Sequence, residues 1–139
     1  MTINGDDLRL VARLCPTGVA IVTTESNGLS AFGITINSFT TLSLTPPLVM
    51  WNLQKSSDTY DEWHRANNFA VNFLKADQAE LSSKHAMQGN KVLAENLVTR
   101  GITQCPMLVD CLFSLECTVH ARYEEGDHVI MIGEVVNII

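Results

Sequence analysis

The feature that most limits the fold of this chain is a strict alternation of apolar and polar residues near its end. From Leu112 to Tyr123, apolar side chains alternate with serine, glutamate, threonine, histidine and arginine. This period of two residues predicts a strand with one buried face and one polar face. A second strand is predicted from His128 to Ile138, after the short turn at 124–127. The two strands predict a long hairpin and a mainly antiparallel β fold.

The rest of the chain supplies further strands and a few helices. Runs of β-branched and apolar residues predict strands over 17–24, 30–37, 48–53 and 69–74, with a hairpin turn at Ser26-Asn27-Gly28. Helices are expected over 6–15, 57–67 and 77–88, and 89–106 is irregular except for a helical turn near 93–97. This order lacks the regular strand-helix alternation of a parallel sheet. We expect one domain over 1–139, a barrel of six or seven antiparallel strands with short flanking helices.

Capping residues set the expected helix ends. Asp6 or Asp7 is expected to cap the first helix, which Pro16 ends and which should cover one end of the sheet. Thr59 and Glu62 have the spacing of a capping box for the second helix.

The charge balance excludes some classes of partner. The chain has 139 residues and a net charge of −6, and it contains no basic run, so we expect neither a nucleic acid nor an anionic membrane as its main partner. No apolar stretch approaches the roughly 20 residues that cross a bilayer. The first residues lack the features of a signal peptide, which favours a cytoplasmic protein.

The four cysteines do not form a Cys-x-x-Cys pair, and no metal site is predicted from them. Cys117 falls on the apolar side of the alternating strand, where a cysteine acts as a small hydrophobic residue. We therefore interpret it as a packing residue.

The strand over 30–37 has two unlike faces. Phe32, Ile34 and Ile36 are bulky, whereas Ala31, Gly33, Thr35 and Asn37 are small or hydrogen-bonding. A small polar face lets a flat ligand approach the backbone closely. The alternative is a face that is simply covered by water.

Two clusters of hydrogen-bonding side chains follow the strands over 30–37 and 48–53. The first is Ser38 to Ser43, and the second contains Asn52, Gln54, Lys55, Ser57 and Thr59. The second cluster ends where a helix is expected to begin, and hydroxyls, one lysine and a helix N-terminus can hold a phosphate. The alternative is that Ser57 or Thr59 only caps the helix.

Among the four histidines, His128 has the most suggestive position, since it follows Gly126-Asp127 at a hairpin. A side chain there can project into a site, and the neighbouring carboxylate can raise the pKa of the imidazole. The spacing of the histidines, serines and cysteines predicts no catalytic triad.

The segment from Gly33 to Val49, GITINSFTTLSLTPPLV, resembles the motif of the flavin reductase-like, FMN-binding split-barrel family. Other segments match in the same order: Thr17-Gly18-Val19, Asn68 to Leu74, Leu115-Glu116-Cys117 and Gly126-Asp127-His128. The similarity runs from about Leu8 to Ile139 and is greatest to the short reductases that supply reduced flavin to two-component monooxygenases.

The resemblance implies a homodimeric Greek-key split barrel that binds FMN or FAD near the dimer interface. It places Thr35, Asn37, Ser38, Thr40 and Thr41 against the flavin, and Lys55, Ser57 and Thr59 along its ribityl-phosphate end. It associates Gly126, Asp127 and His128 with NADH or NADPH, His128 being the residue beside the nicotinamide. Family members continue through a further strand after this point, so we expect the domain to lack its C-terminal strand.

The resemblance also implies the reaction, a hydride transfer from C4 of the nicotinamide to N5 of the flavin. Since the cofactors carry this chemistry, the protein is required only to hold the two rings together. The expected enzyme is an NAD(P)H:flavin oxidoreductase that supplies a partner monooxygenase. The alternative is a flavin-binding electron carrier without catalytic activity, because one fold can support several functions.

Overall fold

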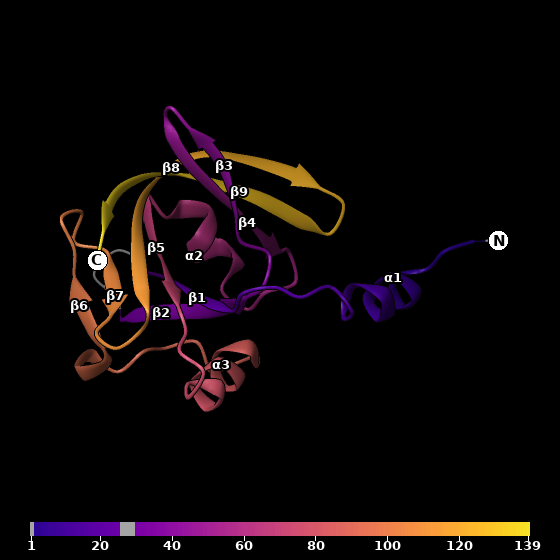
Figure 1. The fold of residues 1–139 in the computed structure, drawn as a ribbon, viewed down its shortest axis with the longest axis horizontal. Helices are drawn as coiled ribbons and strands as arrows, with labels where there is room; N and C mark the ends of the chain where they lie inside the picture. The colour runs from indigo at the N-terminus through magenta and orange to yellow at the C-terminus, as the bar shows by residue number, and fades with distance from the viewer. Residues whose placement is uncertain (1, 26–29) are drawn as a thin grey trace.

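The computed structural model describes residues 2–25 and 30–139. Seven strands form one antiparallel sheet (Figure 1) in the order β2-β1-β5-β8-β9-β4-β3. In chain order they are β1 (Ala20–Glu25), β2 (Ala31–Ile36), β3 (Thr40–Leu44), β4 (Pro47–Gln54), β5 (Asn68–Phe73), β8 (Phe113–Glu125) and β9 (His128–Ile138). Two short strands, β6 (Val98–Arg100) and β7 (Pro106–Leu108), form a separate pair. The predicted fold class, mainly antiparallel β with short helices, is confirmed.

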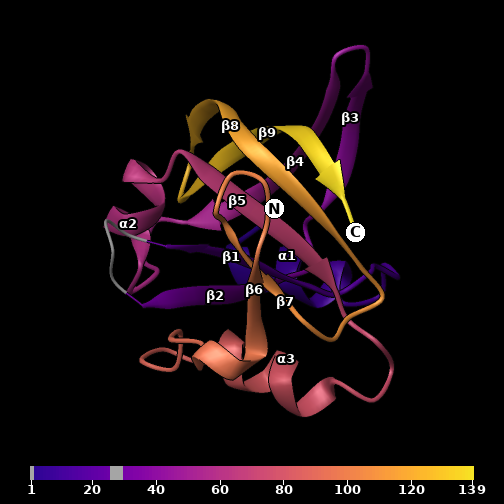
Figure 2. The same ribbon diagram turned by 90° about the vertical axis from the view of Figure 1, so that its left-hand side faces the viewer.

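The sheet curves around one core. Trp63 contacts Phe32 of β2 and Trp51 of β4, with ring centroids 5.4 and 5.0 Å apart, and Trp51 in turn lies 5.9 Å from Phe69 of β5. Strands β2 and β4 are far apart in the order of the sheet, so their shared contact with Trp63 requires the sheet to bend back on itself (Figure 2). The bulky face of β2 packs into this core, as predicted.

The helices are shorter than expected: α1 (Gly5–Ala12), α2 (Tyr60–Arg65), α3 (Ala79–Ala86) and a 3₁₀ turn at Glu95–Leu97. The prediction that Asp6 or Asp7 caps α1 is wrong, because Asn4 is the N-cap and Asp7 completes the capping box. The predicted capping box of α2 is also wrong. Thr59 precedes that helix, but its hydroxyl lies 3.2 Å from the Ser57 hydroxyl and makes no cap hydrogen bond.

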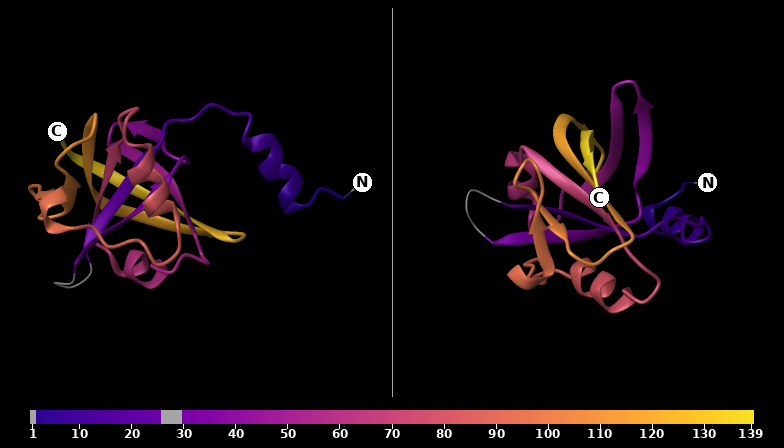
Figure 3. Two further views of the ribbon diagram at one scale, coloured as in Figure 1. Left: turned by 90° about the horizontal axis from the view of Figure 1, so that it is seen from below. Right: turned by 60° about the vertical axis from the view of Figure 1, so that its left-hand side comes forward.

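Helix α1 stands away from the sheet (Figures 1 and 3) and contains no buried residue. Leu8, Leu10 and Val11 are exposed, and Leu14 just after the helix is 83% exposed. The expectation that this helix covers an end of the sheet is therefore wrong for this chain alone. No helix in the described residues is long and apolar enough to span a membrane.

Strand β8 differs from its prediction in one respect. Ser114 and Glu116, which the alternation places on the solvent side, are buried together with Asn72 of β5. They are buried because the segment from Gly101 to Leu108, which includes β7, covers this outer face of the sheet. This segment donates hydrogen bonds to Glu116 and Asn72, and the Ser114 hydroxyl donates to Asn72. Cys117 lies on the inner face, where it is fully buried, and burial raises the pKa of its thiol to about 12. Its interpretation as a packing residue is confirmed.

Three strands were not predicted, namely β3, β6 and β7. Strand β3 is an exposed edge strand, and its one partner within residues 2–25 and 30–139 is β4. It carries three hydroxyl side chains and so lacks the apolar pattern of a buried strand. Strands β6 and β7 have three residues each, too few to show a period. The predicted turn at Ser26-Asn27-Gly28 lies outside the described residues, although β1 and β2 pair antiparallel from Ala20↔Ile36 to Glu25↔Ala31.

Candidate functional site

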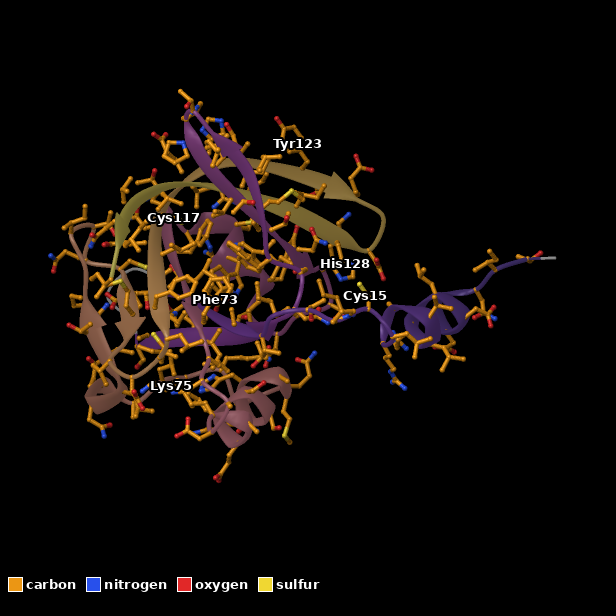
Figure 4. All side chains as sticks on the ribbon, viewed as in Figure 1. Cys15, Phe73, Lys75, Cys117, Tyr123 and His128 are labelled. Atoms are coloured by element: carbon orange, nitrogen blue, oxygen red, sulfur yellow. The ribbon has the colours of Figure 1, made fainter. Side chains whose placement is uncertain are left out.

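A hollow of about 590 Å³ lies beside the base of α1, between the end of β2, strand β4 and the start of β9. This volume is within the range of about 300 to 1,000 Å³ of small-molecule sites. Figure 4 shows His128 on the side of the molecule from which α1 departs. The lining residues are Leu8, Ala12, Ile34, Thr35, Ile36, Asn37, Ser38, Asn52, Gln54, Ser57, Ala86, Gln88, Lys91 and His128.

The end of β2 supplies the first polar side chains of this hollow. The strand ends at Ile36, and Asn37 and Ser38 follow it directly. The hydroxyl of Ser38 accepts a hydrogen bond of 2.9 Å from the backbone N–H of Asn52 in β4. This contact fixes the chain after β2 against β4, so the amides and hydroxyls of both segments face the same space.

The turn after β4 supplies Ser57. Its N–H donates to the carbonyl of Gln54 at 3.0 Å, and its hydroxyl lies 3.2 Å from that of Thr59. Lys55 points elsewhere, since its Nζ lies 3.6 Å from Glu124 of β8 and it does not line the hollow. Helix α2 has only six residues, so its macrodipole is small.

His128 enters the hollow from the first position of β9. Gly126 has a φ of 58°, which glycine adopts without strain, and the turn pairs Glu125 with His128. Nδ1 of His128 lies 2.7 Å from a carboxylate oxygen of Asp127. This hydrogen bond lowers the pKa of Asp127 and fixes the ring, so that Nε2 is the nitrogen left for a ligand.

The small face of β2 is covered by protein rather than by a ligand or water. The hydroxyl of Thr35 donates to the carbonyl of Ser82 in α3 at 2.6 Å, and Nδ1 of His85 lies 3.2 Å from the carbonyl of Gly33. At the edge of the same strand, Leu93 N–H donates to the carbonyl of Ala31 at 2.8 Å. The close approach that the small residues allow is therefore used by α3, and the end of this face at Thr35 and Asn37 reaches the hollow.

Lys91 is a charged lining residue that the sequence did not indicate. Its side chain is 8% exposed, and its Nζ donates to the carbonyl of His85 at 2.8 Å. Burial lowers the pKa of Lys91, while the charge of Asp58 raises it in part. A lysine in an irregular loop carries no signal in the sequence, because its burial depends on α3.

Five predicted residues line the hollow together: Thr35, Asn37, Ser38, Ser57 and His128. Thr59 and Asp127 do not line it but contact Ser57 and His128, respectively. The other four lie outside its wall: Thr40, Thr41, Lys55 and Gly126. Thr40 and Thr41 are exposed on β3, whose hairpin with β4 projects from the body of the molecule (Figure 2).

The side chains of the hollow suit a flat, hydrogen-bonding and anionic ligand. Ile34, Ile36 and Leu8 supply apolar surface, and the amides and hydroxyls supply both donors and acceptors. Among the described residues, the titratable side chains in the wall are those of Lys91 and His128, and no carboxylate lines it. A flavin has an apolar ring with polar edges and a phosphate, and these residues therefore fit one.

Comparisons with known proteins agree with this fit. The sequence pattern of the family described as "Flavin reductase like domain" matches residues 12–139. The FMN reductase (NADH) SmoA of Agrobacterium fabrum is 37% identical over 123 residues, which are 86% of this chain and 68% of that protein.

Two solved structures have similar folds. BorF, the flavin reductase component of a bacterial two-component tryptophan halogenase, has a TM-score of 0.87 and 26% identity, over 97% of this chain and 86% of BorF. The NADH:FAD oxidoreductase SgcE6 of Streptomyces globisporus, in complex with NAD and FAD fragments, has a TM-score of 0.84 and 30% identity, over 100% of this chain and 86% of SgcE6.

Proposed function

The chain belongs to the flavin reductase-like domain family, and we propose that it is an NAD(P)H-dependent flavin reductase. The observation that carries the proposal is the hollow itself, in which predicted flavin-contacting residues of β2 and the 54–57 turn meet His128 of the predicted nicotinamide segment. A pocket that holds only a flavin would not require His128 beside these two segments.

A bound flavin would supply the redox chemistry, which is hydride transfer from the nicotinamide to its N5 atom. The residues of this chain would bind and orient. Asn37, Ser38 and Asn52 would hydrogen-bond the polar edge of the ring, and Ile34 and Ile36 would exclude water from one side of it. His128, with its ring fixed by Asp127, would place the nicotinamide. The protein needs no general acid or base for this reaction.

The direct test is to mix the purified protein with FMN or FAD and with NADH or NADPH, and to follow the loss of nicotinamide absorbance. We expect turnover with at least one pair. Flavin that copurifies tightly without any nicotinamide oxidation would favour the electron-carrier alternative and contradict the proposal.

His128→Ala is expected to raise the KM for the nicotinamide about 5- to 30-fold, which corresponds to one lost hydrogen bond in a site, and to change the KM for flavin less than twofold. The matched control is His120→Ala, because His120 is exposed on β8 and does not line the hollow. Steady-state kinetics with each substrate varied in turn measure both constants. Equal effects on the two KM values would remove the nicotinamide role from His128.

We also propose a homodimer, in which α1 packs against a second copy of this chain. Its exposed apolar residues are supporting evidence, since burying each leucine or valine side chain would contribute about 1.5–3 kcal/mol. Leu8 and Ala12 border the hollow, so a second copy on α1 would also cover the site.

Light scattering tests the dimer. We expect twice the chain mass for the native protein and a shift toward the monomer for Val11→Glu. Arg13→Gln changes the net charge equally and is the control, because Arg13 is the exposed C-cap residue that follows α1. A native protein of monomeric mass would contradict the assembly.

We further propose that the reduced flavin serves a partner monooxygenase in the cytoplasm. Two findings support this proposal: BorF is the reductase component of a two-component system, and the four cysteines of the chain are free thiols, as is usual in a reducing compartment.

A further inference from the structure

We propose that Lys91 supplies the positive charge that holds the phosphate of the flavin. This inference rests on the proposed function, since it concerns one end of the same site. It differs from what the resemblance implies, which assigns that end to Lys55, Ser57 and Thr59.

The backbone of Lys91 is fixed against the edge of β2. Its carbonyl accepts a hydrogen bond of 2.8 Å from Gly33, Leu93 donates to Ala31 at 2.8 Å, and Val92 forms a bridge with Phe32. The lysine is therefore held in place like a residue of the sheet. Lys91 therefore lines the hollow without the loss of loop entropy that a lysine on a free loop would suffer on binding.

The ammonium group of Lys91 lacks a carboxylate partner among the described residues. An ammonium group has three protons, and the hydrogen bonds in this part of the structure use one of them, to the carbonyl of His85. The carboxylate of Asp58 accepts from Gly89 N–H at 2.5 Å. Its charge raises the pKa of Lys91 in part, but within the described residues the two side chains form no ion pair. A buried cation with unused donors, in a wall whose described residues include no carboxylate, favours an anionic ligand.

The neighbours of Lys91 identify which end of the ligand it would meet. Gln88, three residues earlier, donates to the carbonyl of Ser56 at 3.3 Å. This hydrogen bond holds the loop that carries Lys91 against the 54–57 turn. Ser57 and Lys91 line the same hollow. A hydroxyl and an ammonium group in one wall suit a phosphate, whereas Lys55 is already paired with Glu124 outside that wall.

The hydrogen bond from Lys91 to the carbonyl of His85 also has a structural role, which the experiment must separate from phosphate binding. The carbonyl of His85 lies in the last turn of α3, where a cation stabilises the C-terminus of a helix. Lys91→Met removes both the charge and the hydrogen bond to that carbonyl. Lys91→Gln removes the charge but keeps a donor, and Lys91→Arg keeps both.

The experiment compares two probes, FMN and riboflavin, which differ only in the phosphate. Their dissociation constants are measured by quenching of flavin fluorescence, without nicotinamide. We expect Lys91→Met and Lys91→Gln to weaken FMN binding about 10- to 100-fold, as for a lost hydrogen bond to a charged group, and to change riboflavin binding less than about threefold. Lys91→Arg should keep the preference for FMN.

Lys84→Met is the matched control, because Lys84 is an exposed lysine of α3 that does not line the hollow. It should leave both constants unchanged. The inference is overturned if Lys91→Gln keeps the native preference for FMN, or if Lys55→Met abolishes that preference while the Lys91 variants retain it. Wild-type protein that binds neither flavin would instead overturn the proposed function, and the inference with it.

Discussion

Replacing Asn72 by alanine is expected to destabilise the fold by about 3–5 kcal/mol, because it leaves several buried polar groups without partners. The Asn72 side chain is fully buried and donates to the carbonyl of Ile21 at 2.8 Å and to the Thr23 hydroxyl at 3.0 Å. Its oxygen accepts from Leu108 N–H at 2.9 Å and from the Ser114 hydroxyl at 2.8 Å. One side chain thus joins β1, β7 and β8.

Urea unfolding measures this effect, at one protein concentration so that assembly does not change the comparison. Asn67→Ala is the control, because Asn67 is exposed and its side chain makes no hydrogen bond with the described residues. That control should change the free energy of unfolding by less than about 0.5 kcal/mol. If Asn72→Ala lowers the free energy of unfolding by no more than the control does, the stabilising role of the Asn72 hydrogen bonds is contradicted.

Glu116→Gln is expected to cost about 2–4 kcal/mol at neutral pH, since a buried carboxylate loses charge-assisted hydrogen bonds. The Glu116 carboxylate accepts from the N–H groups of Ile102 and Thr103, from the Thr103 hydroxyl and from the amide of Asn137. Burial raises the pKa of Glu116, but these hydrogen bonds, led by that of the Thr103 hydroxyl, lower it by more.

The pKa of Glu116 in the folded state is therefore below the ordinary value of 4.5. Its contribution to stability is fully present above that value and is lost as the pH falls through the folded pKa. The difference in unfolding free energy between wild type and Glu116→Gln should be constant above pH 4.5 and shrink below it. Urea titrations over this range measure it, with the exposed Glu80→Gln as control. A difference in unfolding free energy that grows as the pH falls would contradict the lowered pKa of Glu116.

The elements that sequence reasoning predicted well are those with a local cause. The hairpin of β8 and β9 follows from alternation, and the pairing of β1 with β2 follows from two apolar runs close together in the chain. The burial of Asn72 and Glu116 was missed because their partners lie about 14 to 50 residues away. No local pattern of polar residues indicates which of them a distant loop will cover.

In the candidate site, too, residues with a local sequence signal were predicted and residues placed by distant contacts were missed. Ser38 and Ser57 were predicted from donor clusters that follow strands, and Asn37 from the small, hydrogen-bonding face of the strand over 30–37; all three line the hollow. Lys91 was missed because its position depends on α3 and on a bridge to β2, both formed by the fold rather than by the adjacent sequence. Thr40 and Thr41 lie outside the hollow because the 40–44 segment forms an edge strand.

The central claim is that this chain brings a nicotinamide and a flavin together for hydride transfer. The most direct measurement is anaerobic mixing of the protein and one equivalent of oxidised flavin with one equivalent of NADH or NADPH, followed by the absorbance of both molecules. We predict that the visible absorbance of the flavin and the absorbance of the reduced nicotinamide disappear together, in a one-to-one ratio. Oxidised flavin that persists beside unreacted nicotinamide, for FMN and FAD with either nucleotide, would contradict the account.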